Sequence, residues 1–183
     1  LKTPTLKSML RYAITDRTLF GGNEQERHTR LLEQATTLAT QNIDFLQLRE
    51  KDLDAATLAT LTREILALLR THSPQTRLLL NSRADIAVPT HAHGVHLTSI
   101  PGELTPAQIR NLYTAANLPT PTISISCHTL AEVTHAREAA ATHILFGPVF
   151  EKVAHSEPIS TGIGLHLLQQ ACNLAAPIPV LAL

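Results

Sequence analysis

Three long polar side chains recur at every second position within residues 44–52, DFLQLREKD in one-letter code. They are Gln47, Arg49 and Lys51, and they follow a short apolar run of strand length. Because alternate residues of a β-strand point to the same side, we expect these three side chains on one side of the strand end. Two cations beside an amide can bind a phosphate or diphosphate group, although charges at a strand end can also simply be solvated.

Seven short apolar segments with strand character alternate with helical patterns along the rest of the chain. The strands are predicted within residues 12–15, 44–49, 78–80, 94–97, 123–126, 144–146 and 178–183. Helical spacing of apolar residues predicts helices over 26–40, 54–72, 84–88, 105–118, 129–140 and 164–176. Such alternation indicates a parallel sheet, in which ligands bind at the carboxyl ends of the strands.

This pattern favours the α/β class and a TIM (β/α)8-type barrel over an open doubly wound sheet. An eighth strand does not appear before Leu183, so we expect residues 1–183 to form a single, C-terminally incomplete barrel domain. A chain of 183 residues with 44% hydrophobic content can bury one such core. Residues 151–160 are mixed and polar without any period, and they are expected to form an active-site loop.

The composition argues for a small-molecule partner. The 15 basic and 15 acidic residues balance, so no overall field favours nucleic acid or a membrane surface. Aromatic residues are 3% with no Trp, which argues against stacking on single-stranded nucleic acid. No targeting segment is recognised, and the two distant cysteines do not suggest a disulfide framework, so a cytoplasmic location is expected. The sequence leaves open whether the chain forms a homo-oligomer.

Six short motifs at the predicted strand ends together resemble the thiamine phosphate synthase and thiazole tautomerase (TenI-type) family. In order, they are residues 12–16, 47–51, 81–83, 94–97, 126–129 and 147–150. The resemblance implies a barrel of eight β/α units that acts on a thiazole phosphate. In the synthase branch, 4-amino-2-methyl-5-pyrimidinylmethyl diphosphate is joined to that thiazole with release of diphosphate, assisted by Mg²⁺.

The resemblance also implies roles for individual residues. The diphosphate is expected to contact Gln47, Arg49, Lys51 and Asn81, with Arg49 and Lys51 stabilising the departing charge. The thiazole phosphate is expected near Ser126, Gly162 and Lys152. The Gly162-Ile163-Gly164 turn precedes a predicted helix, whose N-terminal amides favour anions. Residues 152–155 read Lys-Val-Ala-His where the synthases have Thr-x-Thr-Lys. Lys152 would therefore contact the phosphate from a different position in the loop than the family lysine.

The expected Mg²⁺ site is weakened in this chain. Ser82 and Pro101 stand where the family has metal-binding aspartates, and Glu103 is the nearby substitute. Mg²⁺ prefers oxygen ligands, usually one or two carboxylates together with substrate phosphates. The Mg²⁺ cofactor is therefore expected to be held less firmly than in the family.

His128 is the candidate for proton transfer, because an imidazole with a pKa near 6.5 gives and takes protons near neutrality. In the tautomerase branch the matching histidine is the proton shuttle. Its neighbour Cys127 is expected to point to the opposite side of the strand. Three functions thus stay open: a synthase, a metal-independent thiazole tautomerase, and a binder of thiamine intermediates without turnover.

Three histidines, His91, His93 and His96, lie close together in the sequence. Imidazoles at such spacing can bind zinc, and this is one hypothesis for the segment. The alternative is a cluster of surface histidines, with His96 in the strand that follows the turn.

Overall fold

A parallel sheet of seven strands forms the centre of the computed structural model, which describes residues 9–98, 100, 102–154 and 157–183. For residues 152–154 and 157–160 only the backbone is described. The strand order is β1–β2–β3–β4–β5–β6–β9, and every neighbouring pair is parallel. The strands are β1 (Tyr12–Ile14), β2 (Phe45–Leu48), β3 (Arg77–Asn81), β4 (Gly94–Leu97), β5 (Thr122–Cys127), β6 (His143–Phe146) and β9 (Val180–Ala182).

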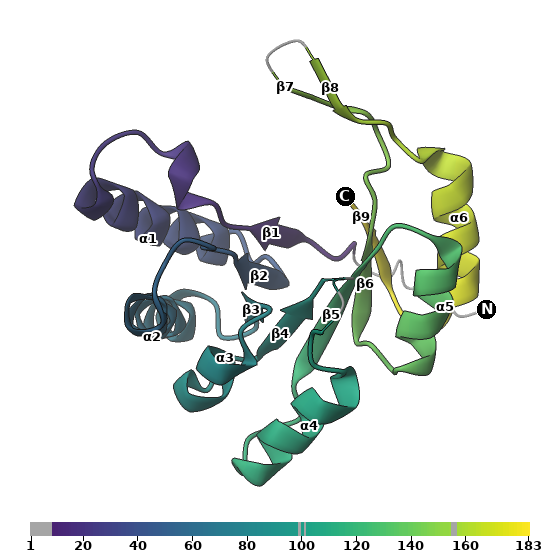
Figure 1. The fold of residues 1–183 in the computed structure, drawn as a ribbon. Coiled ribbons are helices and arrows are strands. Elements are labelled where there is room, and N and C mark those ends of the chain that lie inside the picture. The colour runs from purple at the N-terminus through teal and green to yellow at the C-terminus, as the bar shows by residue number, and fades with distance from the viewer. Residues whose placement is uncertain (1–8, 99, 101, 155–156) are drawn as a thin grey trace, which may run out of the picture.

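Helices connect successive strands and lie around the outside of the curved sheet (Figure 1). They are η1 (Arg17–Leu19), α1 (Glu24–Thr40), α2 (Ala55–His72), α3 (Ala84–Thr90), α4 (Pro106–Ala115), α5 (Leu130–Glu138) and α6 (Gly164–Ala175). The sheet and its helices form a nearly closed barrel, which confirms the predicted TIM-type class. Within the described residues, β1 and β9 are the two edges of the sheet. No described helix combines the length and apolar character needed to cross a membrane.

The strands separate an apolar outer layer from a polar interior. In β2, Leu46 and Leu48 belong to the core beneath the helices, whereas Gln47 contacts Tyr12 of β1 across the sheet interior. The same alternation repeats in β3, where Leu78 and Leu80 pack outward. Barrel interiors are usually filled by Val, Ile and Leu, so the amide and hydroxyl groups inside this barrel are a departure that can serve binding.

Side-chain caps explain where several helices begin. Asn23 and Glu26 form a capping box at α1, and Thr129 and Glu132 form one at α5. At α4, Thr105 caps the helix while Pro106 occupies its first position. These residues satisfy backbone amides that have no partner inside the first helical turn.

Two local predictions were wrong. The helix predicted to stop before Pro89 continues as α3 to Thr90, because one proline removes one hydrogen bond without preventing a single further turn. Residues 151–160, for which only a loop was predicted, contain an antiparallel hairpin of β7 (Lys152–Ala154) and β8 (Glu157–Ser160). Figure 1 shows this hairpin projecting from the barrel, where the two strands satisfy each other's backbone groups.

Candidate functional site

A chain of hydrogen-bonded side chains begins at Gln47, in the interior of the barrel. The Tyr12 hydroxyl donates to Gln47 Oε1 at 2.9 Å, and Gln47 Nε2 donates to Asn81 Oδ1 at 2.8 Å. These contacts fix the orientation of both amides. The two amides that were predicted as neighbours of a diphosphate are therefore together in the structure.

The chain continues to a buried histidine. His96 Nδ1 shares a hydrogen bond with Ser124 Oγ at 2.7 Å, and Nε2 shares one with Ser126 Oγ at 3.0 Å. Ser124 Oγ also lies 3.2 Å from the Tyr12 hydroxyl, so the two parts of the network are joined. Burial, with smaller contributions from the nearby His143 and Arg49, lowers the pKa of His96 to about 3. His96 is thus a neutral hydrogen-bonding group at physiological pH.

Arg49 and Lys51 follow β2 at its carboxyl end. Arg49 is half-buried and Lys51 is exposed. Neither forms an ion pair with a residue that the structure describes. Arg49 is close enough to His96 for its charge to affect that imidazole. Glu50, which lies between them in sequence, is buried and accepts a hydrogen bond from Thr15, the residue after β1. The two cations are thus available to an anion.

The position expected to hold Mg²⁺ contains one carboxylate in the described residues. Glu103 Oε1 accepts hydrogen bonds from the Ser82 and Thr98 hydroxyls, and Oε2 accepts one from the Thr98 amide at 2.6 Å. Both carboxylate oxygens are therefore already engaged, and the donor set does not fit a Mg²⁺ site formed by the protein alone. Among the described residues, no cluster of three or more His, Cys, Asp or Glu side chains could hold an ion. Pro101 lies outside these residues.

His128 follows β5 on the exposed rim of the barrel. Its Nδ1 lies 2.5 Å from the carbonyl oxygen of Gly147, so this nitrogen donates, because a carbonyl oxygen can only accept. The backbone amide of His128 donates to Glu132, part of the α5 cap. Cys127 points outward into the core, as predicted, and burial raises the pKa of its thiol to about 12.

The candidate contacts for a thiazole phosphate are less complete. Ser126 faces the interior through its contact with His96. In the turn before α6, the amides of Ile163 and Gly164 donate to Pro148 and Val149 carbonyls. Gly162 is required there because a Cβ would lie 2.6 Å from backbone atoms of Val149 and Phe150. Lys152 is the first residue of β7, for which only the backbone is described.

The three closely spaced histidines do not converge. His91 is in left-handed conformation after α3, and His93 Nδ1 accepts a hydrogen bond from the Leu78 amide at 2.9 Å. His96 is inside the barrel, only 2% exposed. The interpretation as a surface cluster was therefore wrong for His96, because its strand direction turns the side chain inward. The arrangement gives the zinc hypothesis no support.

A cavity of about 430 Å³ lies between α4 and α5. Leu104, Ile125 and Cys127 contribute to its mostly apolar lining. Because Ile125 and Cys127 face away from the interior, this cavity opens on the outer layer of the barrel. Thr98 and Glu103 also line this cavity, whereas the amide pair and the two cations do not.

Sequence reasoning missed Tyr12, Ser124 and His143, which share the interior with Gln47. Phe45 stacks on His143 with ring centroids 4.2 Å apart, and Tyr12 lies against both rings. Period-two counting within each strand could have placed them inside, but their contacts depend on the register between strands. The structure also links Arg17 to Glu50, a connection across 33 residues of sequence.

Parallel strands in a nearly closed barrel, with polar groups and two cations at their carboxyl ends, define a β/α-barrel protein with its candidate active site at that end. Residues 11–183 match the family model described as thiamine monophosphate synthase. The chain belongs to this family.

Relatives of known name agree with the family. A putative thiamine-phosphate synthase 2 of Aquifex aeolicus is 33% identical over 94% of this chain and 82% of its own length. A putative thiamine-phosphate synthase of Geobacter sulfurreducens is 38% identical over 81% of this chain and 64% of its own. The solved thiamine phosphate pyrophosphorylase from Pyrococcus furiosus shares the fold, with a TM-score of 0.74 and 22% identity over 95% of this chain and 74% of that one. The family and its named members identify a transferase-type enzyme of thiamine biosynthesis.

Proposed function

We propose that this chain joins 4-amino-2-methyl-5-pyrimidinylmethyl diphosphate to a thiazole phosphate, forming thiamine phosphate and releasing diphosphate. The single observation that carries the proposal is that Arg49 and Lys51 have no ion-pair partners in the described structure. They follow, at every second position, Gln47, whose amide is hydrogen-bonded to Asn81. Charge-assisted contacts to phosphate oxygens are stronger than neutral ones, so two such cations suit a diphosphate.

The chemistry asked of these residues is electrostatic. The carbon–oxygen bond between the pyrimidine methylene and the diphosphate breaks, and the thiazole nitrogen forms a carbon–nitrogen bond with that methylene. Negative charge grows on the leaving diphosphate, and Arg49 and Lys51 stabilise it. Gln47 and Asn81, held by Tyr12, orient the bound group without conformational rearrangement.

The second substrate is assigned to the opposite side of the same opening. Ser126, Gly162 and Lys152 are the proposed neighbours of the thiazole phosphate. His128 lies on the same rim, with one ring nitrogen fixed by Gly147. The proposed setting is the cytoplasm, in keeping with two free cysteines, Cys127 and Cys172.

The alternatives of a thiazole tautomerase and a binder without turnover are not favoured by the comparisons, because the relatives carry synthase names. The binder hypothesis drew on the weakened metal site. That weakness alters how an ion would be held but leaves the two cations in place, so it gives no preference for loss of turnover.

The test is a direct assay with both substrates, at a series of Mg²⁺ concentrations and with chelator. Thiamine phosphate formation in the wild type, abolished in Arg49→Ala, is the expected result. A parallel assay of thiazole tautomerisation uses His128→Ala as its control. Tautomerisation that is lost in His128→Ala, without any thiamine phosphate formation by the wild type, would overturn the proposed function.

A further inference from the structure

Charges alternate in sign along Arg49-Glu50-Lys51-Asp52, immediately after β2. Each proposed phosphate-binding cation therefore has an acidic residue directly beside it in the sequence. A carboxylate that reached Arg49 or Lys51 would compete with a phosphate for the same N–H donors. The anion site requires something that keeps these acidic side chains elsewhere.

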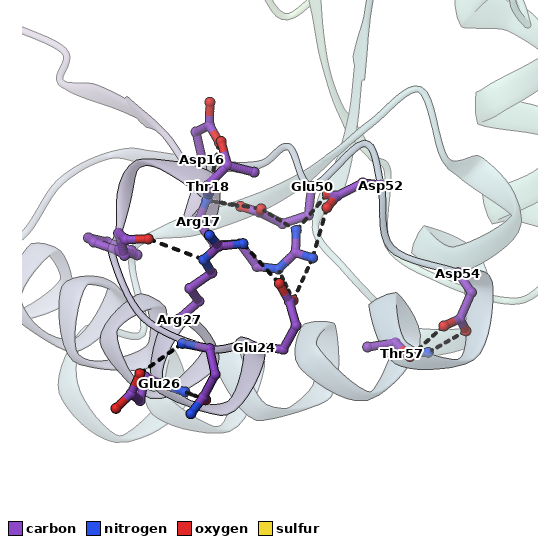
Figure 2. A network of polar contacts seen from close by, with 12 residues as sticks. Asp16, Arg17, Thr18, Glu24, Glu26, Arg27, Glu50, Asp52, Asp54 and Thr57 are labelled. Carbon is purple, nitrogen blue, oxygen red and sulfur yellow. Dashed lines mark hydrogen bonds and ion pairs between the residues drawn. The ribbon is translucent and has the colours of Figure 1, made fainter.

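Arg17, on η1 after β1, gathers the acidic side chains. Its Nη1 and Nη2 donate to the two carboxylate oxygens of Asp52 at 2.5 and 2.9 Å. Nη1 also lies 3.4 Å from Glu50 Oε2, and Nη2 donates to Glu24 of α1 at 2.8 Å. Figure 2 shows the guanidinium at the centre of these three carboxylates.

The Arg17 backbone amide and the Thr15 hydroxyl form further hydrogen bonds with the Glu50 carboxylate. The Arg17 amide donates to Glu50 Oε2 at 3.0 Å, and the Thr15 hydroxyl donates to Oε1 at 2.6 Å. Thr15 Oγ1 in turn accepts from the Arg49 amide at 3.0 Å. The loop after β1 thus holds both the Glu50 side chain and the backbone of Arg49.

Burial decides which of these contacts matters most. The side chains of Arg17 and Glu50 are 5% and 1% exposed, whereas those of Glu24 and Asp52 are 64% and 55% exposed. Exposed ion pairs contribute little to stability, but a buried carboxylate that loses its cation is strongly unfavourable. Without the Arg17 guanidinium, Glu50 would keep its contacts to the Thr15 hydroxyl and the Arg17 amide but would lose its cation. Arg49 and Lys51 are the cations adjacent to it in the chain, so the uncompensated carboxylate would be drawn toward them.

We propose that Arg17 is a positioning residue that holds Glu50 and Asp52 away from Arg49 and Lys51, so that these two cations stay free for a diphosphate. The inference rests on the proposed function and adds a residue to it. Arg17 acts through the loop after β2 and does not itself contact the substrate. It holds the acidic side chains toward η1 and α1, which leaves the two cations without carboxylate partners.

The test compares Arg17→Met, Arg17→Lys and the double variant Arg17→Met with Glu50→Gln. Calorimetric titration with inorganic diphosphate is combined with the KM for each substrate and with kcat. Arg17→Met is expected to weaken diphosphate binding by about 10- to 100-fold, the scale of a misplaced binding group, and to raise the KM of the pyrimidine diphosphate alone. Arg17→Lys, which keeps the charge but cannot bridge three carboxylates, is expected to lie between it and the wild type.

The double variant separates positioning from simple structural support. Glu50→Gln removes the orphaned charge, so it is expected to restore much of the diphosphate affinity that Arg17→Met loses. If Arg17 only stabilised the fold, the second substitution would not restore affinity. The matched control is Arg11→Met, because Arg11 Nη2 donates to the Gln41 and Asn42 carbonyls beyond the other end of α1, both at 2.6 Å. That variant is expected to lose stability without losing diphosphate affinity.

Each outcome has a separate meaning. A wild type that binds no diphosphate and forms no thiamine phosphate would overturn the proposed function, and this inference with it. A functional wild type with an unchanged, folded Arg17→Met variant would overturn only the inference. Should Arg17→Met fail to fold, wild-type diphosphate affinity in Arg17→Lys would overturn it, and weakened affinity would support it.

Discussion

At the scale of single residues, Arg49 is the side chain whose removal should matter most for anion binding. The residue is half-buried, and its side chain has no ion-pair partner in the described part of the chain. We expect Arg49→Ala to weaken diphosphate binding by roughly 2 kcal/mol, because a partly desolvated, charge-assisted contact is lost. Calorimetry with inorganic diphosphate measures this directly.

Arg63→Ala is the matched control, since Arg63 is an exposed arginine on α2. Both variants remove the same net charge, so any general electrostatic effect appears in each. Equal diphosphate affinities in the two variants would contradict the prediction and show that Arg49 is a solvated charge at a strand end.

Ser82 is the residue at which metal dependence can be changed. It adopts a left-handed conformation with φ 56°, which Asp tolerates better than most residues, and its hydroxyl contacts Glu103. Ser82→Asp would place a second carboxylate beside Glu103, and we expect a lower Mg²⁺ concentration for half-maximal synthase activity. We also expect Mg²⁺ to raise the melting temperature of the variant more than that of the wild type.

The melting experiment is independent of catalysis. Without Mg²⁺ the two adjacent carboxylates repel each other, so Ser82→Asp should be less stable than the wild type in chelator. Ser82→Asn, which has a similar shape without the charge, should show neither effect. A Mg²⁺ response shared by the Asn variant would contradict the assignment.

Some residues of the candidate site could be predicted from sequence patterns, and others could not. Gln47, Arg49 and Lys51 were accessible because a period of two within one segment predicts a shared side. Tyr12 and Ser124 were not, since their contact spans 112 residues and depends on how distant strands align. Arg17 was invisible as a partner of Glu50 for the same reason.

At the scale of elements, Gly94 sets how closely β4 and β5 approach. A Cβ at Gly94 would lie 1.8 Å from the carbonyl oxygen of Thr122, a backbone atom that cannot move aside. Gly94→Ala should therefore destabilise the protein by roughly 3 kcal/mol, the upper part of the range for overpacking. Urea unfolding followed by circular dichroism would measure the loss.

Gly21→Ala is the control for that substitution. The atom nearest to a Cβ at Gly21 is the end of the Arg30 side chain at 4.0 Å, so the same chemical change meets no obstacle. Comparable losses in both variants would attribute the effect to glycine flexibility and not to the close approach of the strands.

The order of elements was predictable because each carries its own local signal. The cap at Thr129 with Glu132 marks the start of α5, and apolar spacing marks its extent. The β7–β8 hairpin lacks such a signal, because mixed polar residues can pair through their backbones without any apolar period. The extension of α3 past Pro89 to Thr90 was likewise not predictable, because the sequence pattern does not show whether a helix tolerates an internal proline.

At the scale of the whole molecule, the polar interior places ionisable groups where water does not reach them. His143 is 1% exposed, and neither ring nitrogen has a hydrogen-bond partner among the described residues. Its ring lies against Phe45 and Tyr12, while His96 is the other imidazole in the same interior. Protonation of either histidine inside the barrel is therefore opposed by the surrounding structure.

This interior makes stability depend on pH in a definite direction. Burial lowers the pKa of His143 to about 4, below the ordinary histidine value of about 6.5 that applies to the unfolded chain. Between these values the unfolded chain binds a proton and the folded protein does not. The free energy of unfolding should thus be unaffected by this group above pH 6.5 and fall as the pH drops from 6.5 toward 4, by roughly 3 kcal/mol.

His143→Phe tests this origin of acid sensitivity, because the ring can still stack on Phe45 but cannot take up a proton. Urea unfolding at intervals from pH 7.5 to 4 should show a shallower decline in the variant. The remaining slope is due to His96 and His93 and, toward pH 4, to carboxylates with a lowered pKa such as Asp52 and Asp85. At pH 7 the variant should match or exceed the wild type in stability, since a buried N–H without a partner is removed. His72→Gln, at an exposed histidine of α2, should keep the wild-type slope. A His143→Phe profile parallel to that of the wild type would locate the acid sensitivity elsewhere in the barrel.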